Sequence, residues 1–97
     1  MTFVNMENNE FRVGQAVKSK AGRDKGSIFF VIRVVDENYV MVADGDMRRI
    51  DNPKLKKIKH IVKLSTFSDE LAKRLSSGEK INNAFLRREL EKLGLRS

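Results

Sequence analysis

A nearly unbroken run of β-branched and aromatic residues at positions 28–35 constrains the fold of this chain more than any other feature. Such a run is typical of a β-strand. Residues 36–38, Asp-Glu-Asn, follow as a turn, and residues 39–43 form a second apolar stretch. The pattern predicts a β-hairpin at the centre of the fold.

The faces of this hairpin are assigned from the position of Arg33, the one charged residue in the first strand. Side chains alternate between the two faces of a strand, so Phe30, Ile32 and Val34 lie opposite Arg33 and are predicted to point inward. Val40 and Val42 would meet them. The outer face remains apolar at Phe29, Val31 and Val35, which indicates that another element covers it.

Further strands are expected on both sides of the hairpin, at residues 14–20, 47–50 and 58–64. Asp44-Gly45 suits a tight hairpin turn, and Pro53 breaks the pattern because it lacks the N–H that a central ladder needs. Five short strands at this spacing favour a small antiparallel barrel over a βαβ unit. The predicted fold is therefore mainly β, with this barrel over residues 12–64.

The hydrophobic period changes to a helical one after residue 64. Ser68 is expected to cap a first helix, which ends at Gly78, and Asn82 to cap a second one, which ends at Gly94. Apolar residues recur on one side of each helix, at Leu71 and Leu75 and then at Leu86, Leu90 and Leu93. We expect residues 65–97 to form a two-helix appendage, packed on the outer barrel face or elsewhere, and residues 1–11 to form a flexible polar arm.

A loop dense in cations joins the first two expected strands. Lys18, Lys20, Arg23 and Lys25 oppose only Asp24 within residues 17–26, and Gly26 closes the loop. Glycine permits positive φ and close approach of another molecule. A loop that offers cations together with bare backbone amides suits a polyanion backbone better than a hydrophobic partner.

The charge of +7 is unevenly distributed along the chain. Residues 12–33 hold six Lys or Arg against one acid, residues 34–47 hold four acids and no base, and residues 48–63 hold seven Lys or Arg against one acid. A domain that only needs solubility intersperses its charges. Two basic blocks around an acidic one indicate that one side of the fold faces an anion, and nucleic acid is the first hypothesis.

Several other classes of protein are disfavoured. The chain has no cysteine, which removes disulfides, thiol catalysis and zinc–thiolate sites, and the basic loop lacks the Gly-Lys-Ser/Thr ending of a nucleotide P-loop. His60 is expected to pack among apolar neighbours, Asp44 and Asp46 to serve a turn, and Tyr39 to pack in the core or across strands rather than to stack on a base. We predict no enzymatic activity, no cofactor and no metal. With no apolar leader or membrane span in the sequence, a soluble intracellular protein is expected.

Two segments of the sequence resemble a known family. The segment VKSKAGRDKG at residues 17–26, followed by the apolar strand and by DENYV at residues 36–40, is similar to a KOW motif. The nearest resemblance is to the KOW proteins related to the large-subunit ribosomal protein numbered fourteen in archaea and eukaryotes. Further similarity lies in VADG at 42–45, in Arg48-Arg49, in NPK at 52–54, in KHI at 59–61 and in the helical end, so that it covers roughly residues 12–95.

The resemblance implies an SH3-like barrel that binds structured RNA, large-subunit ribosomal RNA above all, without catalysis. It implies that Gly26 is the key glycine of the motif and that Arg23 and Lys25 lie on the loop that faces RNA. A monomer that is cytoplasmic and ribosome-associated is expected. The pair Phe29-Phe30 departs from the family pattern, which leaves the outer face open for a further contact.

The predicted RNA-binding residues combine the basic loop with the second basic block: Lys18, Lys20, Arg23, Lys25, Gly26, Arg48, Arg49, Lys54, Lys56, Lys57 and Lys59. Two alternatives stay open. The first is a protein-interaction barrel that grips a partner through the Phe29 face and the Leu86, Leu90 and Leu93 helix. The second is a transcription-coupled KOW module that prefers duplex DNA.

Overall fold

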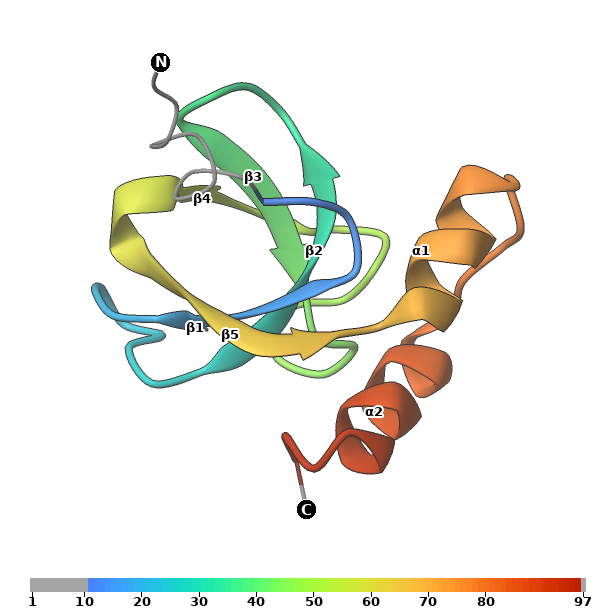
Figure 1. Ribbon diagram of the computed structural model, residues 1–97. Helices are drawn as coiled ribbons and strands as arrows, with labels where there is room; N and C mark the ends of the chain where they lie inside the picture. The colour runs from blue at the N-terminus through green and yellow to red at the C-terminus, as the bar shows by residue number, and fades with distance from the viewer. Residues whose placement is uncertain (1–10, 97) are drawn as a thin grey trace.

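The computed structural model describes residues 11–96 and shows an antiparallel sheet of five strands followed by two helices (Figure 1). The predicted arm over residues 1–11 lies outside the described residues, except for Phe11. The strands are β1 (Gln15–Ser19), β2 (Ile28–Val34), β3 (Tyr39–Ala43), β4 (Lys54–Lys57) and β5 (Ile61–Phe67). A short 3₁₀ helix, η2 (Ile58–His60), joins β4 to β5, and the chain ends with α1 (Asp69–Ser76) and α2 (Asn83–Lys92).

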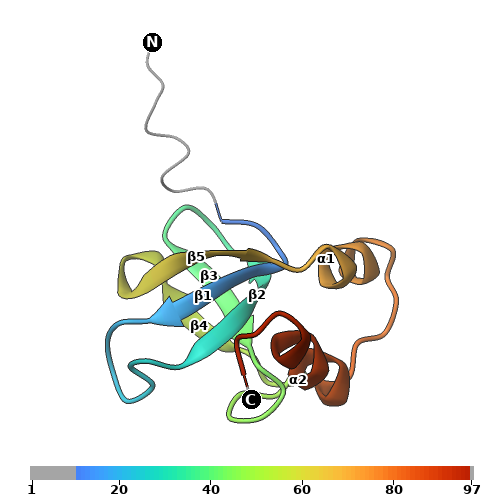
Figure 2. The same ribbon diagram turned by 60° about the horizontal axis from the view of Figure 1, so that its bottom comes forward.

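The strand order, β4-β3-β2-β1-β5, places β4 and β5 at the two edges of the sheet. These edge strands are nevertheless consecutive in the chain and are separated only by η2. The sheet must therefore curl until its edges approach each other where η2 connects them, and the strong curvature is visible in Figure 2. No helix among residues 11–96 has the length and apolar character needed to cross a membrane.

The central hairpin is confirmed, because β2 and β3 pair along the predicted stretches. The assignment of its faces is wrong. Phe29 and Val31, not Phe30, share a buried cluster with the β3 valines, and we call it the strand cluster: Val17, Phe29, Val31, Val40, Val42 and Ile61.

Two features explain this error. The ladder between β2 and β3 shifts between Val31 and Arg33, so Arg33 pairs with Met41 and strict alternation from Arg33 does not hold. Phe30 is also fully buried, in a second cluster on the opposite face. Because both faces of β2 are covered, hydrophobicity alone could not distinguish them.

The second cluster lies between the sheet and the helices, and we call it the helix-side cluster: Ala16, Phe30, Ala43, Leu71, Ile81, Phe85, Leu86 and Leu90. Both helix caps are confirmed, since Ser68 Oγ accepts the Leu71 N–H at 3.1 Å and Asn82 Oδ1 accepts the Phe85 N–H at 2.8 Å. The helices do not cover the predicted outer face with Phe29 and Val31, but pack instead on the face that carries Phe30.

The predicted strand at residues 47–50 is wrong. The Asp44 carboxylate accepts the backbone N–H groups of Asp46 and Arg48, each at 2.9 Å, and Asn83 Oδ1 accepts the Ile50 N–H at 2.7 Å. This loop is thus held by side chains, by α2 and by the backbone hydrogen bonds that Asp44 and Gly45 donate to the Arg48 carbonyl, and not by a strand ladder. The fourth strand is β4, which begins directly after Pro53. The closing strand, predicted over residues 58–64, is wrong at both ends, because residues 58–60 form η2 and β5 continues to Phe67.

Candidate nucleic-acid interface

The basic loop between β1 and β2 is tightly hydrogen-bonded to itself. The Gly26 N–H donates to the Ser19 carbonyl at 2.8 Å, and the Ser19 N–H donates to the Ser27 carbonyl at 2.9 Å. Gly26 has a φ of +91°, with open space around the position of a Cβ. Glycine is required there for its backbone conformation and not for room.

Asp24, the single acid of this loop, is buried at its centre. Its Oδ1 accepts hydrogen bonds from Ser19 Oγ at 2.7 Å and from Lys56 Nζ at 2.9 Å, while its Oδ2 accepts one from Lys54 Nζ at 2.9 Å. Burial alone would raise the pKa of Asp24, but these hydrogen bonds and the Lys56 charge outweigh it and hold the pKa well below its usual range. Asp24 therefore stays ionised and fastens the loop to β4.

This arrangement divides the predicted site residues into two groups. Lys56 is buried, with 7% of its side chain exposed, and Lys54 has 33% exposed; both are bound to Asp24. Lys18, Lys20, Arg23, Lys25, Arg49 and Lys59 are exposed, and Arg48 and Lys57 are half-buried. Lys56 thus stabilises the fold through its ion pair with Asp24. The cations of the loop itself are not bound to Asp24 and are exposed to solvent.

A shallow hollow brings two of the basic loops together. It is lined by Arg23 and Asp24 from the β1–β2 loop, by Met47 and Arg48 from the β3–β4 loop, and by Phe29 and Lys54. Arg23 and Arg48 are far apart in the sequence, and the ion pair between Lys54 and Asp24 lies where their loops meet. We call this the loop hollow.

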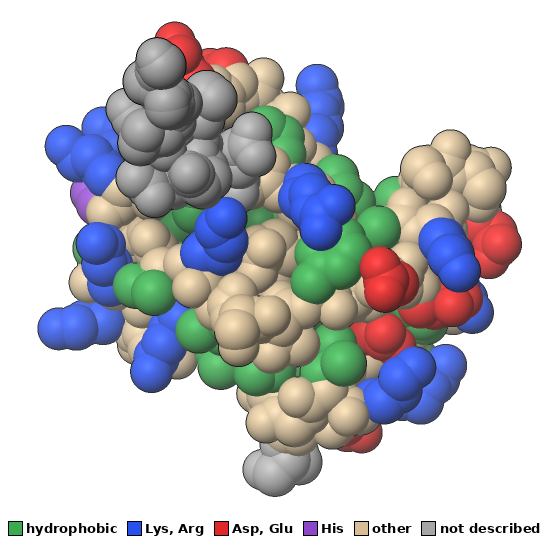
Figure 3. All heavy atoms as spheres, viewed as in Figure 1, with side chains coloured by type: hydrophobic (Ala, Val, Ile, Leu, Met, Phe, Trp, Pro, Cys, Tyr) green, Lys and Arg blue, Asp and Glu red, His purple; other side chains and the backbone are tan. Residues whose placement is uncertain are grey.

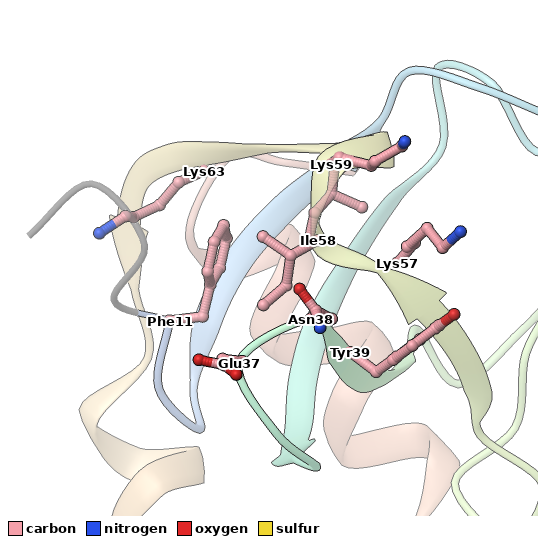
Figure 4. Close-up of a pocket in the computed structure, with 9 residues that line it drawn as sticks. Phe11, Glu37, Asn38, Tyr39, Lys57, Ile58, Lys59 and Lys63 are labelled. Carbon is pink, nitrogen blue, oxygen red and sulfur yellow. The ribbon is translucent and has the colours of Figure 1, made fainter. Parts of the chain in front are cut away.

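A larger pocket lies beside η2, and we call it the aromatic pocket. Its volume is about 650 Å³, and it is lined by Phe11, Glu37, Asn38, Tyr39, Lys57, Ile58, Lys59, Ile61 and Lys63 (Figure 4). The main chain connects this pocket to the basic loop, because the Lys20 N–H donates to the His60 carbonyl at 2.9 Å. Three lysines against one glutamate make the pocket positive.

Basic and acidic side chains are unevenly distributed over the molecular surface. Lys and Arg side chains gather along the left side in Figure 3, over η2 and the β1–β2 loop, whereas most acidic side chains in view lie over the helices on the right. Among the described residues, no three His, Asp or Glu side chains form a group that could hold a metal ion.

The structure does not place every predicted residue at these two hollows. Lys18 is exposed on β1, where it pairs with Ile28 and Val62. Exposed residues on the loops that line neither the loop hollow nor the aromatic pocket are Lys20, Lys25, Gly26 and Arg49, and the buried Lys56 lines neither as well. Sequence reasoning missed Phe11 and Lys63, which line the aromatic pocket, and the anchoring role of Asp24. A lone acid within a basic loop was the available signal for Asp24.

The residues that the sequence offered for a protein contact pack within the fold. Phe29, Leu86 and Leu90 are at most 2% exposed, in the two clusters.

Compared with known proteins, the chain matches no family model and no curated sequence.

Proposed function

We propose that this chain is an RNA-binding protein of the KOW type, whose curled sheet is an SH3-like barrel. It binds structured RNA, namely large-subunit ribosomal RNA, through its basic loops and without catalysis. The observation that carries the proposal is the loop fastened by Asp24, which directs Lys20, Arg23 and Lys25 to solvent.

Preorganisation supports this function. A flexible basic loop would lose conformational freedom when it binds a phosphate backbone, and that loss weakens binding. Here Ser19, Lys54 and Lys56 already fix the loop through Asp24. The loop that carries the exposed cations is therefore preorganised before an anion binds.

The arrangement of charge favours a nucleic acid over a protein partner. Arg23 and Arg48 line the loop hollow, and Lys57 and Lys59 line the aromatic pocket beside η2, which a main-chain hydrogen bond from Lys20 to His60 links to the basic loop. Several separated cations suit a polymer with regularly spaced phosphates. The apolar residues that the sequence offered to a partner protein are buried in the fold, Phe29 in the strand cluster and Leu86 and Leu90 in the helix-side cluster.

Salt dependence of binding tests this proposal. A structured fragment of large-subunit ribosomal RNA is titrated with the protein by fluorescence anisotropy over a series of salt concentrations. If about five phosphates are engaged, log K should fall against log salt with a slope of about −3.5 to −4.5. A salt-insensitive affinity would contradict the proposal.

Matched double variants assign the binding to the loop. Arg23→Ala with Lys25→Ala should weaken binding and reduce the slope by about 1.4 to 1.8, because two phosphate contacts are lost. Lys73→Ala with Lys80→Ala removes the same charge from exposed positions on the helical side and should leave the slope nearly unchanged. Equal effects of the two variants would show that net charge, and not the loop, drives binding.

Two further arms separate the alternatives. Preference for duplex DNA of equal length would favour the transcription-coupled module. Sedimentation of the tagged protein through sucrose gradients of lysate, at low and high salt and with or without RNase, tests the ribosomal assignment. The protein should travel with large subunits at low salt and leave them at high salt.

A further inference from the structure

The aromatic pocket combines aromatic rings with lysines, whereas the basic loop offers cations alone. Phe11 and Tyr39 present rings at its walls, and Lys57, Lys59 and Lys63 surround it (Figure 4). Its volume of about 650 Å³ lies within the range of small-ligand sites, about 300–1,000 Å³. The pocket is therefore large enough for a planar ring system with an attached anion.

The Phe11 ring is held by packing, and Tyr39 is held through its backbone. Phe11 is half-buried and packs against the strand cluster. Tyr39 belongs to neither buried cluster, but its N–H donates to Asp36 Oδ1 at 2.9 Å and its carbonyl accepts the Val35 N–H at 3.0 Å. Its backbone is fixed by the β2–β3 turn while its ring is left partly open to solvent.

Lysines lie close to both rings. Lys57 Nζ is 5.9 Å from the centre of the Tyr39 ring, and Lys63 Nζ is 5.5 Å from the centre of the Phe11 ring. Within the described part of the chain, Lys57 and Lys59 form no ion pair, although Glu37 lines the same pocket. Positive charge at this pocket therefore remains available to a ligand.

We infer that the aromatic pocket takes a single unpaired nucleotide of the bound RNA; this inference rests on the proposed function. The base stacks on the Tyr39 ring, whereas the sequence favoured packing in the core or across strands for this residue; the structure leaves Tyr39 outside both buried clusters. The phosphate contacts Lys57 and Lys59. Every base has a π-face, so stacking requires no particular sequence. Asn38 and Glu37 offer hydrogen-bonding groups to the edge of the base.

The position of the pocket allows both contacts at once. The hydrogen bond between Lys20 and His60 joins the end of β1 to η2, so the pocket and the basic loop occupy neighbouring parts of one surface. An RNA helix on the loop can then deliver a bulged or looped-out nucleotide to the pocket. Folded RNA is often recognised through such unstacked bases.

Three RNA hairpins with the same stem test this inference. One is fully paired, one carries a single unpaired nucleotide, and one carries an abasic site at that nucleotide. The wild-type protein should bind the unpaired-nucleotide hairpin about tenfold more tightly than either of the others, which corresponds to the stacking of one base. The abasic hairpin keeps the phosphate and isolates the contribution of the base.

Variants of Tyr39 connect this preference to the pocket. Tyr39→Leu should reduce the preference to about one while leaving the affinity for the paired hairpin unchanged, and Tyr39→Phe should keep it. Since Tyr39 is the only tyrosine of the chain, intermolecular NOEs between its ring and the base can be assigned in the wild-type protein without any variant. That measurement decides the question even if Tyr39→Leu does not fold.

The outcomes separate the two proposals. Equal binding of the three hairpins, with no NOE from Tyr39 to the base, would overturn the nucleotide inference, leave the proposed RNA binding standing and open the pocket to a protein segment. A preference that survives in folded Tyr39→Leu would also overturn it. Failure of the wild-type protein to bind any RNA, the ribosomal fragment included, would overturn both.

Discussion

Asp24 and Glu89 are both nearly closed to solvent, at 7% and 5% exposure, but they are stabilised in different ways. Asp24 binds two lysines and a serine hydroxyl in the basic loop. Glu89 accepts a hydrogen bond from Ser68 Oγ at 2.8 Å, and its other oxygen is 3.7 Å from the ammonium of exposed Lys92. One carboxylate neutralises buried charge, and the other mainly serves as a hydrogen-bond acceptor.

The difference shows how the two sides of the sheet are built. On the helix side, the Ser68 hydroxyl caps α1 and donates to Glu89 of α2, so one small polar group joins the two helices. In the basic loop, Asp24 binds Lys54 and Lys56 of β4, and the cations of the loop itself remain exposed to solvent. Ion pairs therefore stabilise the candidate interface, whereas a serine hydroxyl connects the two helices on the other side of the sheet.

Replacing Asp24 should have the largest effect. Asp24→Asn leaves the buried Lys56 ammonium without its counter-charge and should lower the free energy of unfolding by about 3–5 kcal/mol, measured by urea denaturation at pH 7. Adding Lys56→Met removes the stranded charge and should restore most of the loss. A loss below about 1 kcal/mol in the single variant would show that the pair contributes little.

Replacing Ser68 should come next. Ser68→Ala removes the cap of α1, worth about 0.5–2 kcal/mol, and also leaves Glu89 without its donor. We expect a total loss of about 2–3 kcal/mol by the same measurement. Asn82→Ala is the matched control, since Asn82 caps α2 but makes no bond to a buried acid. Equal losses in the two variants would mean that the contact with Glu89 adds nothing.

Acid should selectively remove the contribution of Asp24. Because its pKa is lower in the folded protein than in the unfolded chain, where it is about 3.9, the stabilisation is complete only at pH values well above the unfolded-state pKa. It is lost as the pH falls from about 5 towards the folded-state pKa. The stability difference between wild type and Asp24→Asn should shrink by on the order of 2 kcal/mol on lowering the pH from 7 to 2. A constant difference would contradict the lowered pKa.

Replacing Glu89 should have the smallest effect. In Glu89→Gln the amide oxygen can still accept from Ser68, and only a long contact with exposed Lys92 is lost. The free energy of unfolding should change by about 1 kcal/mol or less. A loss comparable to that of Asp24→Asn would remove the distinction between the two carboxylates.

Local signals predicted the helices and the central hairpin correctly. The caps at Ser68 and Asn82 and the turn after Val35 depend on residues within a few positions of one another. The face of β2 was mispredicted because a ladder shift and burial on both sides remove the signal on which alternation depends.

Long-range contacts explain what the sequence did not reveal. Residues 54–57 carry three lysines and did not resemble a strand, because the buried partner of Lys56 is Asp24 in a distant loop. The aromatic pocket was missed for a similar reason. Phe11, Tyr39 and Lys63 come from separate parts of the chain, and only the curled sheet brings them together.

The pairing of β1 with β5 has a consequence for the chain while it is being synthesised. Almost fifty residues separate the end of β1 at Ser19 from the end of β5 at Phe67. At about 5–20 residues per second, the free edge of β1 would wait several seconds for its partner. Lysines discourage pairing at an open strand edge, so Lys18 and Lys20 would also protect the nascent chain against association with its neighbours.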